Sequence, residues 1–231
     1  MKKAYFLALL ALAGGYWLLL SKPALYYGNS LDYKCFTLRG RGEIPASHQL
    51  ALDRALERVS TSEFFSPETR FDVYIAGGQW ELGFFAPFVS GYNARVSPIN
   101  GGIFLAPADF EADQSLPSAK GAEPRALNKV IAAAAARKMV ISKVKPLTYV
   151  FMSDWEVAGY GESISGGSGR FTPPDICESE APEGSALRDY EYGLAVDLIM
   201  NVEKISFADL LNKNYSHEAI KRQLKQRYCG R

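Results

Sequence analysis

An uninterrupted run of alanines, Ala132–Ala136, constrains the fold of this chain more than any other stretch. The run follows an apolar pair, Val130 and Ile131, and ends at Arg137. Alanine has the highest helix propensity of all residues, and its small side chain lets a neighbouring backbone approach closely. The pattern therefore predicts a well-packed helix over residues 125–139. One interpretation is that this stretch is a core-packing helix that carries no catalytic or metal-binding side chain.

A second segment, Asp154–Glu162, reads DWEVAGYGE and predicts another helix. Taken together, the two segments resemble the active-site helices of the zincin metallopeptidases, in the gluzincin arrangement that is also called peptidase MA-like. In that family the first helix carries H-E-x-x-H after an apolar run, and a later helix carries W-x-x-E-G-Y. Two histidines four residues apart lie on one helix face and bind one zinc ion, while the adjacent glutamate is the general base.

The residues that carry this chemistry in the family are replaced in this chain. The first histidine position is Ala133, the general base is Ala134, the second histidine is Arg137 and the third-ligand glutamate is Ala158. Alanine offers no ligand atom, and a protonated guanidinium offers no lone pair. The resemblance therefore implies a zincin-like scaffold, a pseudopeptidase, which holds neither zinc nor another cofactor and has no catalytic residue.

The resemblance extends from about residue 33 to residue 224 and implies an α+β fold, with a small mixed sheet packed on helices. In zincins the sheet strand at the edge of the cleft aligns a peptide by strand addition. Asn100–Pro107 (NGGIFLAP) matches that strand. Glu162 lies one turn after Ala158, where an ion pair or a surface acid is the simpler interpretation. The expected cleft-lining residues are Ile103, Phe104, Trp155, Tyr160 and Glu162.

The N-terminal residues predict a membrane anchor. Two lysines precede an uncharged apolar run, Ala4–Leu20, which is close to the shortest length that spans a bilayer. A possible signal-peptidase site at Ala11–Ala13 is followed by more apolar residues, which favours an uncleaved signal anchor. We therefore expect residues 1–21 to form a single-pass transmembrane helix and 22–32 a spacer. Residues 33–231 would then form one domain on the extracytoplasmic, periplasmic side.

Cysteine and histidine are scarce in this chain. Its three cysteines allow one disulfide with one thiol left over, and Cys35 with Cys229 is one candidate pair because these residues flank the folded region. Its two histidines, His48 and His217, have no second histidine or cysteine at ligand spacing. We expect both histidines to be solvated surface residues.

The composition narrows the possible functions. A net charge of +1 and the lack of a basic stripe argue against nucleic-acid binding. The Gly-rich segment 163–174 lacks the Gly-Lys-Ser/Thr ending of a phosphate-binding loop. We expect a membrane-anchored pseudopeptidase that binds a protein or peptide partner in the cell envelope. The alternatives are a structural or assembly subunit of an envelope membrane complex, and an active metallopeptidase with ligands from Asp154, Glu156, Glu162 and one histidine.

Overall fold

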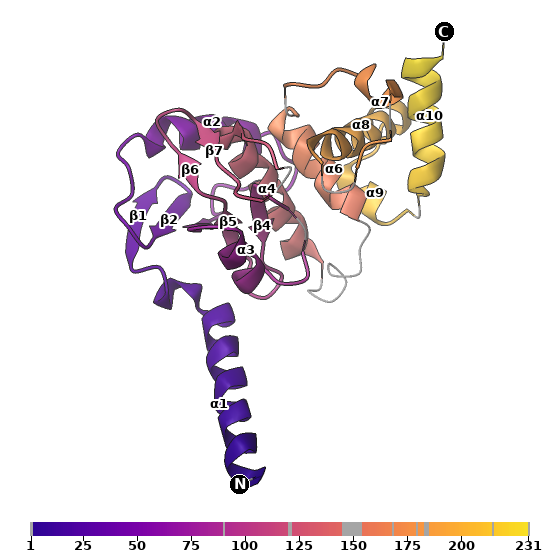
Figure 1. Ribbon diagram of the computed structural model, residues 1–231. Coiled ribbons are helices and arrows are strands. Elements are labelled where there is room, and N and C mark those ends of the chain that lie inside the picture. The colour runs from indigo at the N-terminus through magenta and orange to yellow at the C-terminus, as the bar shows by residue number, and fades with distance from the viewer. Residues whose placement is uncertain are drawn as a thin grey trace.

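The computed structural model describes residues 2–89, 91–119, 122–144, 154–167, 169–178, 180–182, 185–213 and 215–230. Within these residues the chain is α+β, with a mixed five-stranded sheet, a three-stranded sheet and helices. Figure 1 shows the sheets together with helices α2, α3 and α4 in one part of the molecule, and helices α6 to α10 gathered in another.

The larger sheet has the strand order β1-β2-β3-β5-β4. Strands β2, β3 and β5 are parallel to one another, whereas β1 and β4 run antiparallel to their neighbours and form the two edges. Alternation of apolar and polar residues is clearest in β2, since every second side chain points to the same face, whereas the three residues of β5 are all apolar and buried. The strands are β1 (Asn29–Tyr33), β2 (Phe36–Gly40), β3 (Phe71–Ile75), β4 (Ala94–Val96) and β5 (Ile103–Leu105). The smaller sheet comprises β6 (Ala108–Asp109), β7 (Gln114–Ser115) and β8 (Arg125–Ala126).

Helix α4, which contains the alanine run, lies at the centre of the packing. It contacts α2, α6, β4 and β5, and all five alanines are buried because methyl groups let helices and strands approach from several sides. Serine side chains cap two of the later helices, at Ser185 and Ser206. The helices are α1 (Lys2–Ser21), η1 (Pro23–Leu25), α2 (His48–Val59), α3 (Gln79–Phe85), α4 (Leu127–Lys143), α6 (Asp154–Ser165), α7 (Asp175–Glu178), α8 (Ala186–Glu203), α9 (Phe207–Leu211) and α10 (His217–Cys229).

The prediction of an edge strand over Asn100–Pro107 is wrong. Strand β5 pairs with β3 on one side and with β4 on the other, and its residues Ile103 and Phe104 are fully buried. The chain reverses direction between Ser97 and Gly102, where Ser97 N–H donates to Gly102 O at 2.9 Å. This reversal folds β4 back onto the side of β5 that the sequence suggested was open.

The predicted N-terminal transmembrane helix is also wrong, and with it the single-pass anchored localisation. Among the residues that the structure describes, no helix is long and apolar enough to cross a membrane. Helix α1 carries two lysines in its first turn, and its uncharged part, Ala4–Leu20, is at the short limit for a membrane span. Its last turns also contact the sheet-containing part, since Tyr16 Oη donates to Phe84 O at 3.1 Å and Asn100 Nδ2 donates to Leu20 O at 2.5 Å.

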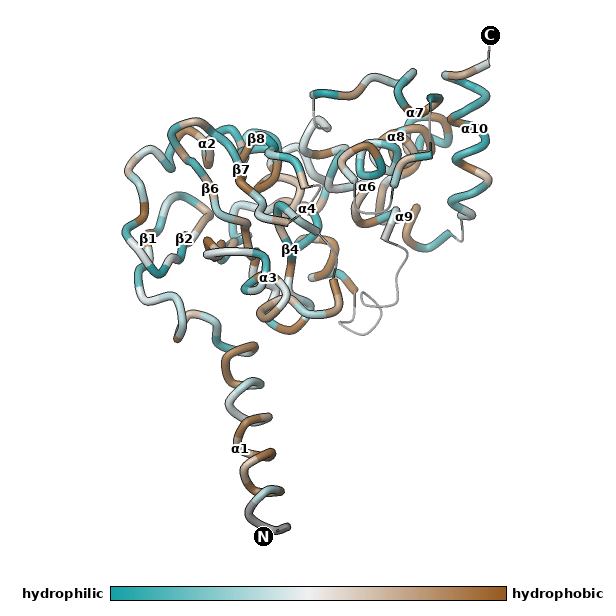
Figure 2. The backbone as a smooth tube through the Cα atoms, viewed as in Figure 1, coloured by the Kyte–Doolittle hydropathy of each residue, from teal (hydrophilic) through white to brown (hydrophobic). Residues whose placement is uncertain are grey.

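Hydrophobic residues nevertheless occur along the length of α1, and Figure 2 shows them on a helix that extends away from the other elements. Phe6, Leu9 and Leu12 are among its exposed side chains. Helix α10 differs, because Figure 2 shows it as mostly hydrophilic. It packs on α8 through its few apolar residues, such as the buried Ile220 and Leu224.

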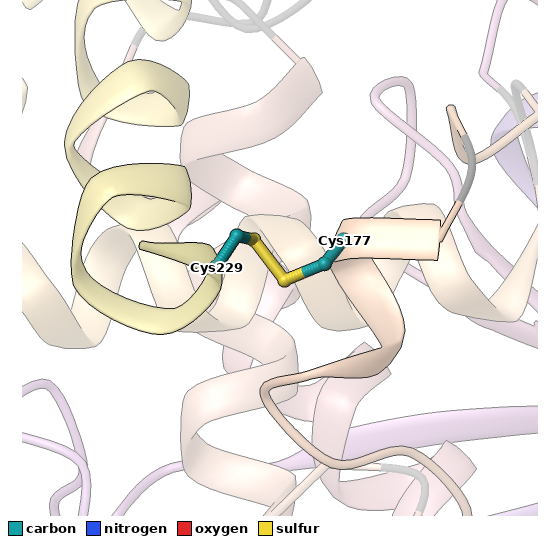
Figure 3. Close-up of a disulfide and its surroundings, with 2 residues drawn as sticks. All are labelled: Cys177 and Cys229. Atoms are coloured by element: carbon teal, nitrogen blue, oxygen red, sulfur yellow. A yellow bond between two sulfur atoms is a disulfide. The ribbon is translucent and has the colours of Figure 1, made fainter. Parts of the chain in front are cut away.

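A disulfide joins Cys177 on α7 to Cys229 at the end of α10 (Figure 3). Cys35 is a free, buried thiol next to β2, so the candidate pair of Cys35 with Cys229 is wrong. The two bonded cysteines are 52 residues apart in sequence. The bond therefore closes a long loop that contains α8 and α9.

Candidate functional site

Helices α4 and α6 meet at a glycine. A Cβ atom added at Gly161 would lie 2.9 Å from Ala133 O and 3.0 Å from Arg137 Nε, so only glycine allows this approach. On the other side of α6, a Cβ atom at Gly159 would clash with Tyr192 O on α8. Helix α6 is therefore held tightly between α4 and α8.

This contact includes two of the four positions, Ala133 and Arg137, at which the zincin resemblance places a metal site. Ala133 and Arg137 are four residues apart and lie on the α4 face that meets α6. Ala158 precedes Gly161 by three residues and lies on the corresponding face of α6. Ala133 and Ala134 are buried, whereas Arg137 and Ala158 are partly exposed.

The residues at this contact do not fit a zinc ion. Three of the four positions are alanines, and the fourth is a guanidinium, whose charge would repel a dication. Among the described residues, no group of three or more histidine, cysteine, aspartate or glutamate side chains could hold a metal ion. We therefore derive no metal-dependent step for this contact.

Glu162 is part of a buried ion pair. Its side chain is 1% exposed, and Arg125 Nη2 lies 2.6 Å from Oε1 and 2.8 Å from Oε2. Arg125 Nη1 also lies 3.4 Å from Asp189 Oδ2 on α8. Burial disfavours the charge of the guanidinium, but the two carboxylates outweigh it and raise the pKa of Arg125. Arg125 on β8 therefore links Glu162 on α6 to Asp189 on α8.

The other two candidates on α6 lie in the core. Tyr160 is buried, its hydroxyl lies 2.7 Å from Ser62 Oγ, and its ring stacks on Phe207. Trp155 is also buried and stacks on the ring of His217 at 5.6 Å between centroids. Together with the buried Ile103 and Phe104 of β5, these residues pack within the molecule instead of lining a cleft.

The expectation that both histidines are solvated is wrong. His48 is buried, with Nδ1 2.7 Å from Pro45 O. His217 is covered by Trp155 and by Tyr192, and its Nε2 lies 3.7 Å from Glu191 Oε1. Burial lowers the pKa of His217, although Glu191 opposes that shift. Aromatic residues distant in sequence cover this ring, which explains why its local sequence did not reveal the burial.

The alternative of an active metallopeptidase names two further acids on α6 as ligands, Glu156 and Asp154. Glu156 is half-buried, and burial raises its pKa to about 7, a value that suits a general base. It lies two residues before Ala158, which places it on roughly the opposite side of α6. The side chain of Asp154 lies outside the described residues. A single carboxylate with a raised pKa on this side of α6 does not replace the missing zinc ligands.

A second polar cluster, which the sequence did not reveal, lies at the carboxyl ends of β2 and β3. The fully buried Glu81 accepts from Tyr27 Oη at 3.0 Å and from Gly77 N–H at 3.0 Å, and Arg41 Nη2 lies 2.9 Å from it. A cavity of about 250 Å³ adjoins the cluster and is lined in part by Arg41, Gly77 and Glu43. The Gly77-Gly78 pair after β3 is the local sequence feature at this cluster, and it indicates only the end of the strand.

No family model, curated protein or solved structure matches this chain.

Proposed function

We propose that this protein is a catalytically inactive, zincin-like domain that binds an extended segment of a protein or peptide partner at strand β4. The observation that carries the proposal is the position of β4 (Ala94–Val96), which forms an edge of the larger sheet and packs against α4. An edge strand offers backbone donors and acceptors to an incoming chain.

The backbone of β4 is arranged for such pairing. Ala106 N–H donates to Asn93 O at 2.8 Å, and Ser97 N–H donates to Gly102 O at 2.9 Å. Because backbone groups alternate in direction along a strand, those of Ala94 and Val96 face away from β5. The two residues are 8% and 2% exposed, so an incoming chain must displace what covers them. No further strand lies on that side within the described part of the chain. Capture at β5 itself is excluded, since β4 covers it.

The order of the elements gives independent support. Strands β4 and β5 are followed by α4, and α6 then packs across α4 at Gly161. The zincin resemblance implies sheet strand, zinc-helix position and third-ligand position in this order. The alanines at three of the four former-site positions favour binding without hydrolysis. A structural or assembly subunit remains the alternative, and it requires no peptide at this edge.

Peptide selection with a backbone-directed variant tests the proposal. We expect the full chain to select peptides from a random heptapeptide library and to leave them uncleaved. Val96→Pro removes the outward N–H and should weaken a selected peptide by about tenfold, the effect of losing a main-chain hydrogen bond. Val96→Ala also shortens the side chain but keeps the N–H, so its affinity should stay within about threefold of the wild type.

Fluorescence anisotropy with the labelled peptide measures these affinities, and circular dichroism verifies that both variants are folded. Equal affinities for the Val96→Pro and Val96→Ala variants would contradict strand addition at β4. Failure of the wild-type chain to select any peptide would favour the assembly alternative.

A further inference from the structure

The connections that leave the parallel neighbours β2 and β3 run to opposite faces of the larger sheet. Helix α2 follows β2, and helix α3 follows β3. Val73 of β3 belongs to the apolar cluster that contains the buried residues of α2, whereas Tyr74 belongs to the cluster that contains those of α3. Adjacent side chains of a strand point to opposite faces, so the two helices cover different faces. Where neighbouring parallel strands connect in this way, a crevice opens at their carboxyl ends, and ligands of open sheets bind there.

The cavity of about 250 Å³ lies at this position. Its lining comes from the segment that follows β2, from the end of β3 and from the first residues after β5. The volume is below the ~300–1,000 Å³ of pockets for drug-sized ligands, so it suits a smaller molecule. Apolar lining is provided by Ile44, Ile75 and Phe110. The charged lining residues in the described part of the chain are Arg41 and Glu43.

The guanidinium of Arg41 is fixed in place from several sides. Its Nη2 lies 2.9 Å from Oε1 of the fully buried Glu81, and its Cζ lies 5.5 Å from the centre of the Tyr26 ring. A Cβ atom at Gly77 would clash with Arg41 Nη2, so glycine makes room for this placement. The Arg41 side chain is nevertheless 51% exposed. Because a guanidinium has five N–H donors, it can bind Glu81 and a second anion together.

The charges around the cavity select the kind of ligand. Glu81 balances the charge of Arg41 from behind the lining, and the exposed Glu43 adds a negative charge at the lining itself. A simple anion would therefore meet the unbalanced carboxylate of Glu43, and a simple cation would meet the guanidinium. A small molecule that carries both charges is complementary to both residues.

We propose that this cavity binds a free α-amino acid with an apolar side chain. Its carboxylate pairs with Arg41, as the planar fork of a guanidinium favours, and its ammonium group pairs with Glu43. Its side chain lies on the apolar part of the lining. Strand β5 separates this position from β4 in the sheet, so the inference goes beyond peptide capture at β4 and does not depend on it.

Isothermal titration calorimetry of the full chain with the twenty free amino acids tests the inference. We expect at least one amino acid with an apolar side chain to bind with a dissociation constant below about 1 mM. The N-acetylated form of that amino acid lacks the cation, and its amide lacks the anion. Each derivative should bind at least about tenfold more weakly, as the loss of a charged hydrogen bond implies.

Four variants assign the two charges and the place of binding. Glu43→Gln should abolish the effect of acetylation, whereas Glu57→Gln, which changes an exposed acid of α2, should leave it unchanged. Arg41→Lys keeps a cation beside the buried Glu81 but loses the fork, so it should reduce the effect of amidation at least about threefold. Ile44→Trp fills the cavity from a partly buried position and should abolish binding. Circular dichroism verifies that each variant is folded.

Three results would overturn the inference. The first is that none of the twenty amino acids binds in the expected range. The second is that amidation weakens binding but acetylation does not, which would identify a site for a simple anion. The third is binding that survives Ile44→Trp in a folded chain, which would place the ligand elsewhere. Peptide capture at β4 is measured with the Val96 variants, so each of these results leaves it intact.

Discussion

Replacing Glu162 by alanine is expected to lower the free energy of unfolding by about 3 kcal/mol, because it leaves the buried guanidinium of Arg125 without its main partner. Glu162 is 1% and Arg125 10% exposed, so water does not take over the lost interaction. The value lies at the lower end of the usual range for breaking a buried pair, since Asp189 stays 3.4 Å from Arg125. Urea unfolding followed by circular dichroism gives the free energy.

Two further variants make this prediction specific. Glu57→Ala removes an exposed acid from α2 and should change the stability by less than about 0.5 kcal/mol. A double variant with Arg125→Met and Glu162→Leu replaces the pair by apolar groups of similar size and should recover most of the lost stability. If Glu162→Ala is no more destabilising than Glu57→Ala, the ion pair does not hold α6 in place.

Reduction of the Cys177–Cys229 disulfide is expected to lower the free energy of unfolding by about 4 kcal/mol, the loop-closure value for its 52-residue separation. The bond restricts the unfolded chain, and its loss also frees the end of α10 from α7. Urea unfolding with and without dithiothreitol measures the difference.

The third cysteine supplies the control for this measurement. Cys35 is buried and not bonded, so Cys35→Ala should leave the effect of dithiothreitol unchanged. A double variant with Cys177→Ser and Cys229→Ser should abolish the effect. Thiol titration of the unfolded wild-type chain should give one thiol before and three after reduction. If stability does not change while the thiol number rises from one to three, the disulfide does not stabilise this fold.

The two central helices were predictable from local sequence. The alanine run Ala132–Ala136 predicted a closely packed helix, and α4 contains it with all five side chains buried. The segment Asp154–Glu162 likewise predicted a helix, and α6 contains it. Both predictions succeeded because helix propensity and close packing of small residues act within a few turns of one segment.

The errors concern contacts between distant segments. Strand β4 has three residues, too few for a periodic pattern, and its pairing with β5 depends on a reversal at Ser97 that the sequence did not reveal. The partner of Cys229 could not be chosen, because three cysteines allow several pairs. His217 is partly buried because its ring stacks on Trp155, which lies far earlier in the chain.

The candidate site was predictable only as a set of positions. The sequence aligned Ala133, Arg137 and Ala158 with a metal site, and the structure places Ala133 and Arg137 at one contact with Gly161 of α6. The local pattern left two interpretations of Glu162, a cleft acid or an ion pair. The ion pair with Arg125 shows that the second interpretation holds. Arg125 lies on β8, distant in sequence from α6, so the residues around Glu162 could not reveal this partner.

Elemental analysis of the full chain, purified without chelators, tests most directly the claim that the α4–α6 contact carries no metal chemistry. We expect a folded protein with far less than one zinc per chain, and no change in its melting temperature when a chelator is added. One zinc per chain, with a melting temperature that falls on chelation, would show that this chain does hold a structural or catalytic zinc ion. Glu162, His48 and His217 would then be the first residues to replace.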